Sequence, residues 1–194
     1  MKIFFYKYGS ICEPDISDSF RRLGFEVIDE DMEIYNKNLL PSQCVETVSK
    51  KLIDGQFTFV FTINFFPWLS DLCEIMHLKY ISLIVDSPVL ELYSYSLKND
   101  CNRIFLFDRC LYNEFEPFNQ GHIFHVPLAA DINRIQNVIK NASTSEKAKF
   151  ASDIFIPLPI TSLRPAKSGS EPFTNATVSL MPTRRIVLFA AIVL

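Results

Sequence analysis

Short runs of β-forming residues, separated by segments with helical apolar spacing, constrain the fold of this chain more than any other feature. The strongest run, 57–63, has seven β-forming residues and stops at Asn64. Parallel strands need crossover segments, and both faces of a parallel sheet are buried. The alternation therefore predicts an α/β fold, a Rossmann-like parallel sheet with helices on both faces. The predicted strands are 2–8, 26–29, 57–63, 79–85, 103–107 and 122–126.

Helices are predicted in the intervals between the first strands. The first helix has Asp15 or Ser17 as its N-cap and ends at Gly24, since glycine readily adopts the left-handed conformation that ends many helices. The second is expected over 40–53 and the third over 66–76, where the apolar spacing suits a helix.

The candidate site is formed by the residues that follow each predicted strand, because ligands of such sheets bind outside the carboxyl ends of the strands. These residues are Gly9–Ser10, Asn64–Pro67, Asp86–Pro88, Asp108–Arg109 and Pro127–Leu128. The first turn lacks the glycines of a dinucleotide fingerprint, which disfavours an NAD-linked enzyme. A helix N-terminus at that turn could still meet a phosphate.

Charge and cysteine content exclude several classes of function. Nineteen Lys and Arg against 22 Asp and Glu give a net charge of -3, without the basic field that nucleic acids require. The five cysteines are odd in number and include no Cys-x-x-Cys pair, so neither a disulfide framework nor a zinc site is expected. The apolar N-terminal stretch is too short for a signal-peptide core, which predicts a cytoplasmic protein.

Asp86 is the sharpest catalytic candidate. It follows a strand and precedes Ser87–Pro88, and the proline restricts Ser87 to extended conformations. A carboxylate held there suits a general base or a ligand of the acceptor, and the competing interpretation is a turn in which Asp86 binds neighbouring backbone N–H groups. Asp108–Arg109 is a weaker candidate, because Asp108 could simply cap a helix and pair with Arg109 at the surface.

Asn64, Phe66 and Pro67 could place an amide and a ring beside a sugar, whose apolar faces pack on aromatic rings. Burial in the core is the competing interpretation for the phenylalanines of this motif. Among the three histidines, only His125, at the end of the last predicted strand, is a catalytic candidate. The histidines have no metal-binding spacing, so we expect neither a metal nor another cofactor.

Five motifs between residues 61 and 131 occur in a recognisable order. They are Asn64-Phe65-Phe66-Pro67 with Leu69-Ser70 and Cys73, then Lys79-Tyr80-Ile81, Asp86-Ser87-Pro88, Ile104-Phe105-Leu106-Phe107-Asp108-Arg109, and Pro127-Leu128-Ala129-Ala130-Asp131. In this order they resemble the N-terminal domain of CgeB-like (spore maturation protein type) bacterial glycosyltransferases. The first 56 residues match only in the layout of strands and helices, and Leu83-Ile84-Val85 stands where the family has an aromatic residue.

The resemblance implies one half of a GT-B enzyme, in which two Rossmann-like domains face a cleft and act without a metal. Its N-terminal domain holds the hydroxyl acceptor, and its C-terminal domain holds the nucleotide-sugar donor. Residues 1–150 correspond to the acceptor domain, with Asp86 or His125 as the base. Ser87, Pro88, Asp108, Arg109, Pro127 and Leu128 join Asn64, Phe66 and Pro67 as substrate-binding candidates. A donor domain would need roughly 150 further residues, so we expect the chain alone to be an inactive fragment.

Residues 151–194 depart from the β-α pattern and are predicted to be an irregular tail of low order. Prolines punctuate a Ser/Thr-rich stretch, and 186–194 is apolar throughout but far shorter than the ~20 residues that span a bilayer. The family is expected to continue as Asp-Ile-Ser-Phe near residue 153. One inserted base converts codons for that sequence into codons for Asp153–Ile156, so we interpret the tail as a frameshift product.

Two other functions remain open on the sequence. One is a non-catalytic α/β binding module, of flavodoxin-like or response-regulator-like type, that acts through protein contacts. Paired acidic residues after the first strand would favour a receiver domain, and neither Tyr8-Gly9-Ser10 nor Cys12-Glu13 supplies them. The other is a partner subunit that binds a sugar or nucleotide without turnover.

Overall fold

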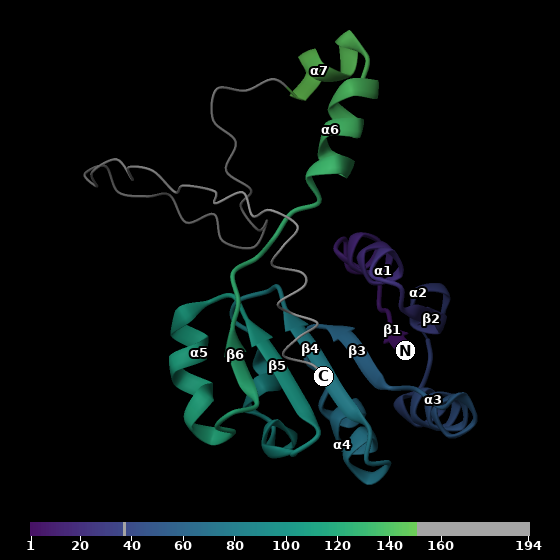
Figure 1. Cartoon of the computed structure of the whole chain (residues 1–194), viewed down its shortest axis with the longest axis vertical. Coiled ribbons are helices and arrows are strands. Elements are labelled where there is room, and N and C mark those ends of the chain that lie inside the picture. The colour runs from purple at the N-terminus through teal and green to yellow at the C-terminus, as the bar shows by residue number, and fades with distance from the viewer. Residues whose placement is uncertain (37, 151–194) are drawn as a thin grey trace. The chain divides into compact units, whose positions relative to one another are not determined.

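The computed structural model describes residues 1–36 and 38–150. Residues Met1–Leu128 form a compact unit around one sheet of six parallel strands, ordered β2-β1-β3-β4-β5-β6 (Figure 1). This arrangement confirms the α/β, Rossmann-like class that the strand pattern predicts. The strands are β1 (Lys2–Tyr6), β2 (Glu26–Glu30), β3 (Phe59–Ile63), β4 (Lys79–Ile84), β5 (Asn102–Leu106) and β6 (Ile123–His125).

Helical segments connect consecutive strands of this unit. They are α1 (Glu13–Arg22), α2 (Met32–Tyr35), α3 (Pro41–Gly55), α4 (Pro67–Ile75) and α5 (Arg109–Phe115), with short 3-10 turns η1 (Leu90–Tyr93), η2 (Tyr95–Lys98) and η3 (Glu116–Phe118). A second unit begins at Ala129 and contains α6 (Ile132–Asn141) and α7 (Thr144–Phe150). The predicted tail, 151–194, lies outside the described residues.

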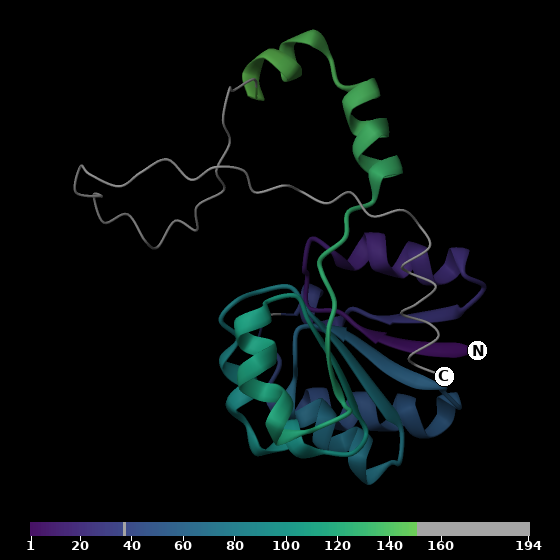
Figure 2. The ribbon, with the colours of Figure 1, turned by 60° about the vertical axis from the view of Figure 1, so that its left-hand side comes forward.

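Helices cover both faces of the sheet, and the alternation of side chains along each strand decides which residues meet them (Figure 2). On one face, Phe4 and Tyr80 belong to a core that also includes Leu52 of α3, Leu69 of α4 and Phe115 of α5. On the opposite face, α1 lies over β1 and β3. Its side chain Phe20 meets the ring of Phe61 edge-on at 5.0 Å and the ring of Phe59 at 6.1 Å. The central strand β3 is therefore buried on both faces, as the middle of a parallel sheet requires, whereas the edge strand β2 leaves Glu26 and Ile28 exposed.

The first helix begins earlier than its sequence indicates. Neither Asp15 nor Ser17 caps it: α1 starts at Glu13, with Cys12 as the N-cap residue. Its end follows the prediction, because Gly24 has a φ of 86°, a conformation that glycine adopts without strain. The physical reason for the early start is the burial of the Glu13 carboxylate, which binds the turn after β1 and is described with the site below.

The order of the strands determines where a ligand can bind. β1 pairs with β2 on one side and with β3 on the other. The strand order therefore reverses between β1 and β3: β2 is added on one side of β1, and the later strands are added on the other side. In open α/β sheets the crevice at such a reversal, outside the carboxyl ends of the strands, is where ligands bind. The order β2-β1-β3-β4-β5 is that of flavodoxin-like folds, with β6 added at the edge.

A buried polar network fixes the segment between β4 and β5. The side chain of Asn102, fully buried, donates to the carbonyls of Ser96 at 2.8 Å and Leu97 at 3.0 Å, and accepts from the Ser70 hydroxyl at 2.7 Å. Asn119 donates to the same Leu97 carbonyl at 2.7 Å. Because these bonds satisfy the buried polar groups, η2 is held firmly against α4 and β5.

The described part of the chain contains no helix that is both long and apolar enough to cross a membrane.

Candidate functional site

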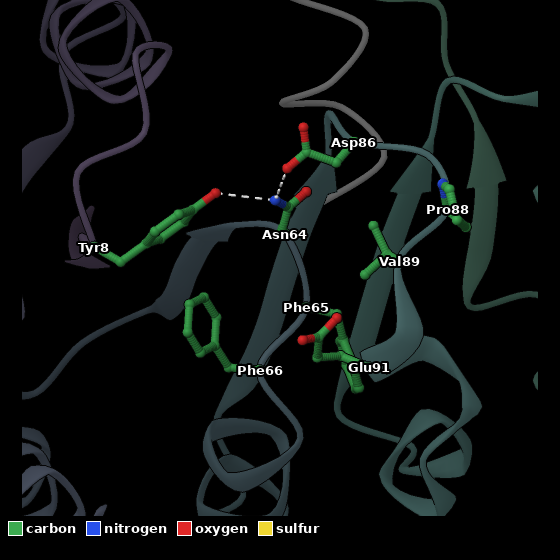
Figure 3. A pocket seen from close by; sticks show the side chains of 8 residues that line it. All are labelled: Tyr8, Asn64, Phe65, Phe66, Asp86, Pro88, Val89 and Glu91. Carbon is green, nitrogen blue, oxygen red and sulfur yellow. Dashed lines mark hydrogen bonds between the residues drawn. The ribbon is translucent and has the colours of Figure 1, made fainter. Parts of the chain in front are cut away.

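The residues after β1, β3 and β4 meet at the reversal point of the sheet and line a pocket of about 360 Å³. Tyr8 follows β1, Asn64 follows β3, and Asp86 follows β4, so three strand ends contribute polar side chains to one place (Figure 3). The lining residues are Tyr8, Asn64, Phe65, Phe66, Asp86, Pro88, Val89 and Glu91. The volume suits a small organic ligand, since such pockets commonly measure about 300–1,000 Å³.

The backbone conformation of Asn64 places this residue at the centre of the arrangement. Its φ of 57° places it in the left-handed region, which asparagine tolerates better than most residues. The Asn64 N–H donates to the carbonyl of Leu83 at 2.9 Å, and its carbonyl accepts from the Thr62 hydroxyl at 2.6 Å. These two bonds turn the chain sharply at the end of β3 and direct the side chain across the strand ends.

A second set of hydrogen bonds below the pocket supports this turn. The buried Tyr80 hydroxyl lies 2.8 Å from the Thr62 hydroxyl and accepts from the Phe66 N–H at 2.9 Å. Since Thr62 donates its only proton to Asn64, Tyr80 must donate to Thr62. The chain of bonds therefore runs from Phe66 through Tyr80 and Thr62 to the Asn64 carbonyl, and it joins β4 to the loop that carries the site.

Replacing Tyr80 with phenylalanine tests this support. The substitution keeps the ring but removes the hydroxyl, which leaves the Phe66 N–H and the Thr62 hydroxyl each short of a partner. We expect it to lower the unfolding free energy by about 1–2 kcal/mol, the effect of unpairing buried polar groups. Urea unfolding measures the loss, and Tyr93→Phe, at an exposed tyrosine, is the control. An unchanged denaturation midpoint would show that the hydroxyl does not support the turn.

The side chain of Asn64 uses all of its polar atoms within the protein. Its Oδ1 accepts from the Val85 N–H at 3.1 Å, while its Nδ2 donates to the Tyr8 hydroxyl at 2.9 Å and to Asp86 Oδ2 at 2.6 Å. Figure 3 shows the amide between the phenol and the carboxylate. Asn64 therefore links all three strand ends and orients Asp86.

Asp86 is exposed, and Asn64 is the residue seen to hold its carboxylate. Among the described residues no backbone N–H bonds this carboxylate, so the structure gives no support to the interpretation of Asp86 as a simple turn or cap residue. Its Oδ2 receives the Asn64 amide, and Oδ1 has no protein donor in the same part of the chain. A carboxylate oriented in this way at the mouth of a pocket can accept a proton or a hydrogen bond from a ligand.

The turn after β1 is filled by a carboxylate of the protein itself. Glu13, only 3% exposed, accepts from the Tyr8 N–H at 2.9 Å and from the Gly9 N–H at 3.2 Å. Backbone N–H groups at such a turn bind phosphate in many nucleotide-binding folds. Here Glu13 already occupies the N–H groups of Tyr8 and Gly9, which argues against the phosphate contact that the sequence left open at this turn.

Two aromatic rings form one wall of the pocket. The rings of Tyr8 and Phe66 lie 5.5 Å apart, and Phe66 is half-buried, whereas Phe65 is buried in the core. Burial raises the pKa of the Tyr8 phenol, and the charges of Asp86 and Glu13 raise it further. Tyr8 therefore stays protonated at neutral pH. The pocket wall combines an apolar surface with a neutral hydroxyl.

A neighbouring group of predicted residues lies at the ends of β4, β5 and β6. The Ser87 hydroxyl donates to Asp108 Oδ2 at 2.6 Å, and Asp108 Oδ1 accepts from the Cys110 N–H at 2.7 Å, which caps α5. The cap interpretation of Asp108 is confirmed. The Ser87 hydroxyl, the Cys110 N–H and the charge of His125 lower the pKa of Asp108. His125 also lies 3.2 Å from the Phe107 carbonyl through its Nε2.

The structure divides the predicted site residues into three sets. Asn64, Phe66, Asp86 and Pro88 line the pocket. Ser87, Asp108 and His125 form the neighbouring group, and no described contact joins His125 to Asp86. Pro67 is the first residue of α4, Arg109 is the exposed first residue of α5, and Pro127 and Leu128 are exposed beyond β6. Their assigned roles in substrate binding stay predictions.

The sequence interpretation missed Tyr8, Glu13 and Glu91. Tyr8 was included in the first predicted strand, but β1 ends at Tyr6, so Tyr8 belongs to the loop at the carboxyl edge. Glu13 could have been found from its position four residues beyond Gly9, at the start of a helix. Glu91 lies in a 3-10 turn and carries no pattern that distinguishes it from a solvated surface residue.

The described residues contain no group of three or more His, Cys, Asp or Glu side chains that could hold a metal ion. The side chains that line the pocket supply carboxylates, an amide, a phenol and aromatic rings.

Fold and pocket together define a class: an α/β domain with a doubly wound parallel sheet and a ligand pocket at its reversal point. No protein-family model and no curated protein matches the chain. One similar solved structure is a yeast Spc42 trimeric coiled coil, amino acids 181–211, fused to another structure. It is 8% identical with a TM-score of 0.38, and the match covers 72% of this chain and 76% of that chain. This likeness carries no functional argument.

Proposed function

We propose that the chain is a glycosyltransferase-like protein of the CgeB-like type, whose pocket binds the hydroxyl-bearing acceptor. The observation that carries the proposal is the Asp86 carboxylate, oriented by the 2.6 Å bond from Asn64 at the mouth of a pocket lined by aromatic rings. Sugar rings combine apolar faces with many hydroxyl donors. Aromatic side chains pack on the faces, and a carboxylate accepts from the hydroxyls.

Asp86 is the proposed general base. An acceptor hydroxyl that donates to its Oδ1 would pass its proton to the carboxylate as the hydroxyl oxygen bonds to the anomeric carbon of the donor sugar. The bond from that carbon to the nucleotide phosphate breaks, and its electron pair leaves with the phosphate. Asn64 holds Oδ2 throughout, so it acts as a positioning residue.

Turnover by the 194-residue chain alone is not expected. In the GT-B arrangement that the resemblance implies, the donor lies on a second Rossmann-like domain, and the described residues contain one parallel sheet. We therefore expect the purified chain to bind saccharides without hydrolysing or transferring a nucleotide sugar. Measured transfer of sugar by this chain would contradict the proposed division between acceptor and donor domains.

Saccharide binding is tested by NMR titration of the full chain labelled with ¹⁵N. We expect neutral or amine-bearing disaccharides to shift the backbone amides of Asn64, Phe66, Asp86 and Val89, with dissociation constants on the order of 1 mM. Asp86→Ala removes a charge-assisted acceptor and is expected to weaken binding about tenfold.

The control for that variant is Asp54→Ala, which removes an exposed carboxylate near the end of α3. It should leave the dissociation constant unchanged. A titration in which no saccharide moves the pocket amides, or in which both variants weaken binding equally, would overturn the proposal.

The alternative, a non-catalytic binding module, is favoured by one observation, the flavodoxin-like strand order. Flavin and nucleotide ligands of such folds present phosphate to the turn after β1. In this chain Glu13 binds the N–H groups of Tyr8 and Gly9 in that turn. Titration with FMN separates the two proposals, because flavin binding at the pocket amides would support the module and exclude the acceptor site.

A further inference from the structure

We infer that the pocket selects an amine-bearing sugar, a ligand rich in hydrogen-bond donors that carries positive charge. The inference rests on the proposed acceptor site and specifies its substrate class. Three features of the pocket support it: the signs of its charges, the hydrogen-bonding groups that its side chains leave to a ligand, and the occupation of the Tyr8, Gly9 and Phe66 N–H groups.

The charged side chains that line the pocket are both carboxylates, Asp86 and Glu91, and no Lys, Arg or His is among the lining residues. The Glu91 carboxylate has no hydrogen bond or ion pair within the described part of the chain. Lys7, the residue after β1, is engaged in an ion pair with Asp29 at 2.8 Å. The pocket therefore has a negative potential, which attracts a cation and repels an anion.

The hydrogen-bonding groups offered to a ligand are mostly acceptors. Asn64 would be the natural donor, but it uses both of its amide hydrogens, on Tyr8 and on Asp86. Asp86 and Glu91 only accept when ionised. The Tyr8 hydroxyl accepts from Asn64, and the other four lining residues, Phe65, Phe66, Pro88 and Val89, have no polar side-chain atoms. Such a pocket matches a ligand that donates, through hydroxyls and an ammonium group, and mismatches a phosphate, which is an anion with mostly acceptor oxygens.

The backbone does not supply the missing donors at the turn after β1. The Tyr8 and Gly9 N–H groups bind the buried Glu13 carboxylate, and the Phe66 N–H binds the Tyr80 hydroxyl. The rings of Tyr8 and Phe66, by contrast, offer π-faces that attract an ammonium group. Together these features favour a protonated amine over both a neutral sugar and an anionic one.

Two nearly isosteric disaccharides test the inference. Chitosan disaccharide carries an ammonium group at C2 of each ring where cellobiose carries a hydroxyl. In NMR titrations of the full chain near pH 6, where amines are protonated, we expect the amine form to bind about three- to tenfold more tightly. Inorganic phosphate and UDP should leave the pocket amides unshifted.

Glu91→Gln removes the charge while it keeps the shape of the side chain. It should weaken binding of the chitosan disaccharide more than binding of cellobiose, so that the preference for the amine falls about threefold or more. Glu26→Gln, an exposed carboxylate at the start of β2, is the matched control and should change neither dissociation constant.

The outcomes separate this inference from the proposed function. Equal binding of both disaccharides, each weakened by Asp86→Ala, would overturn the preference for an amine and leave the acceptor site in place. Shifts of the pocket amides by phosphate or UDP would overturn it as well. Binding of neither disaccharide would overturn the acceptor site itself, and the inference with it.

Discussion

Replacing Asn64 with alanine is expected to lower the unfolding free energy by about 2–3 kcal/mol and to abolish saccharide binding at the pocket. The variant loses the bonds to Tyr8, Asp86 and the Val85 N–H, which leaves the last of these without its side-chain acceptor. It also places alanine at a φ of 57°, where the Cβ atom is strained. Both effects loosen the carboxyl edge of the sheet at its reversal point.

The variant Asn64→Gly distinguishes the effect of losing the side-chain hydrogen bonds from the effect of backbone strain. Glycine adopts the left-handed conformation without strain, so this variant should unfold less readily than Asn64→Ala while it still fails to bind saccharides. Urea denaturation measures the stabilities, and ¹⁵N NMR titration with chitosan disaccharide measures the binding. If Asn64→Ala retains normal affinity, Asp86 does not depend on the amide for its orientation, and the positioning role is wrong.

Replacing Glu13 with alanine is expected to lower the unfolding free energy by about 2–3 kcal/mol, because buried hydrogen bonds to a charged group are the strong ones. The variant leaves the N–H groups of Tyr8 and Gly9 without their acceptor and removes an acidic residue from the first turn of α1. Glu13→Gln keeps one side-chain acceptor and should lose about half as much.

The Glu13→Ala variant is also expected to gain an affinity for anions. Once Glu13 is replaced by alanine, the Tyr8 and Gly9 N–H groups, in the turn between β1 and α1, form the kind of site that binds sulfate or phosphate. A bound anion should restore about 1 kcal/mol of stability at a concentration several times its dissociation constant. Thermal unfolding in sulfate, compared with chloride of equal ionic strength, measures this gain against the unmodified chain and against Glu26→Ala. An identical change in stability in all three proteins would show that the Glu13 carboxylate does not occupy an anion-binding site.

The stability that Asp29 contributes depends on pH in a direction set by its surroundings. Although burial opposes the effect, Lys7, Arg21 and Ser17 lower the pKa of Asp29 below its ordinary value. A carboxyl group with a lowered folded-state pKa stabilises the fold above its unfolded-state pKa, and this contribution is lost as the pH falls through the folded-state value. The ion pairs of Asp29 in β2 with Arg21 of α1 and with Lys7, the residue after β1, should therefore weaken in acid.

Most of the fold follows from local features of the sequence. The run of β-forming residues that ends at Asn64 became β3, and the segment that follows it became α4, with Pro67 in the first turn as its fixed φ permits. Each strand lies within or close to its predicted run, because a strand buried on both faces needs continuous apolar sequence. The left-handed end of α1 at Gly24 follows equally from local chemistry. The start of α1 could not be predicted in this way, because the Glu13 side chain binds the N–H groups of the turn that precedes the helix.

The sequence by itself determined the class of the fold and the edge of the sheet at which a site must lie, because strand length, polarity and chain alternation are local properties. It also placed Asp86 and Asn64 at that edge. Only the tertiary structure decided which strand ends are neighbours. The order β2-β1-β3-β4 brings Tyr8 and Asp86, which are 56 and 22 positions from Asn64 along the chain, to its side chain and leaves His125 with a different group. Which donors remain for a ligand depends on those contacts, so the expected charge of the ligand could not be inferred before the chain was folded.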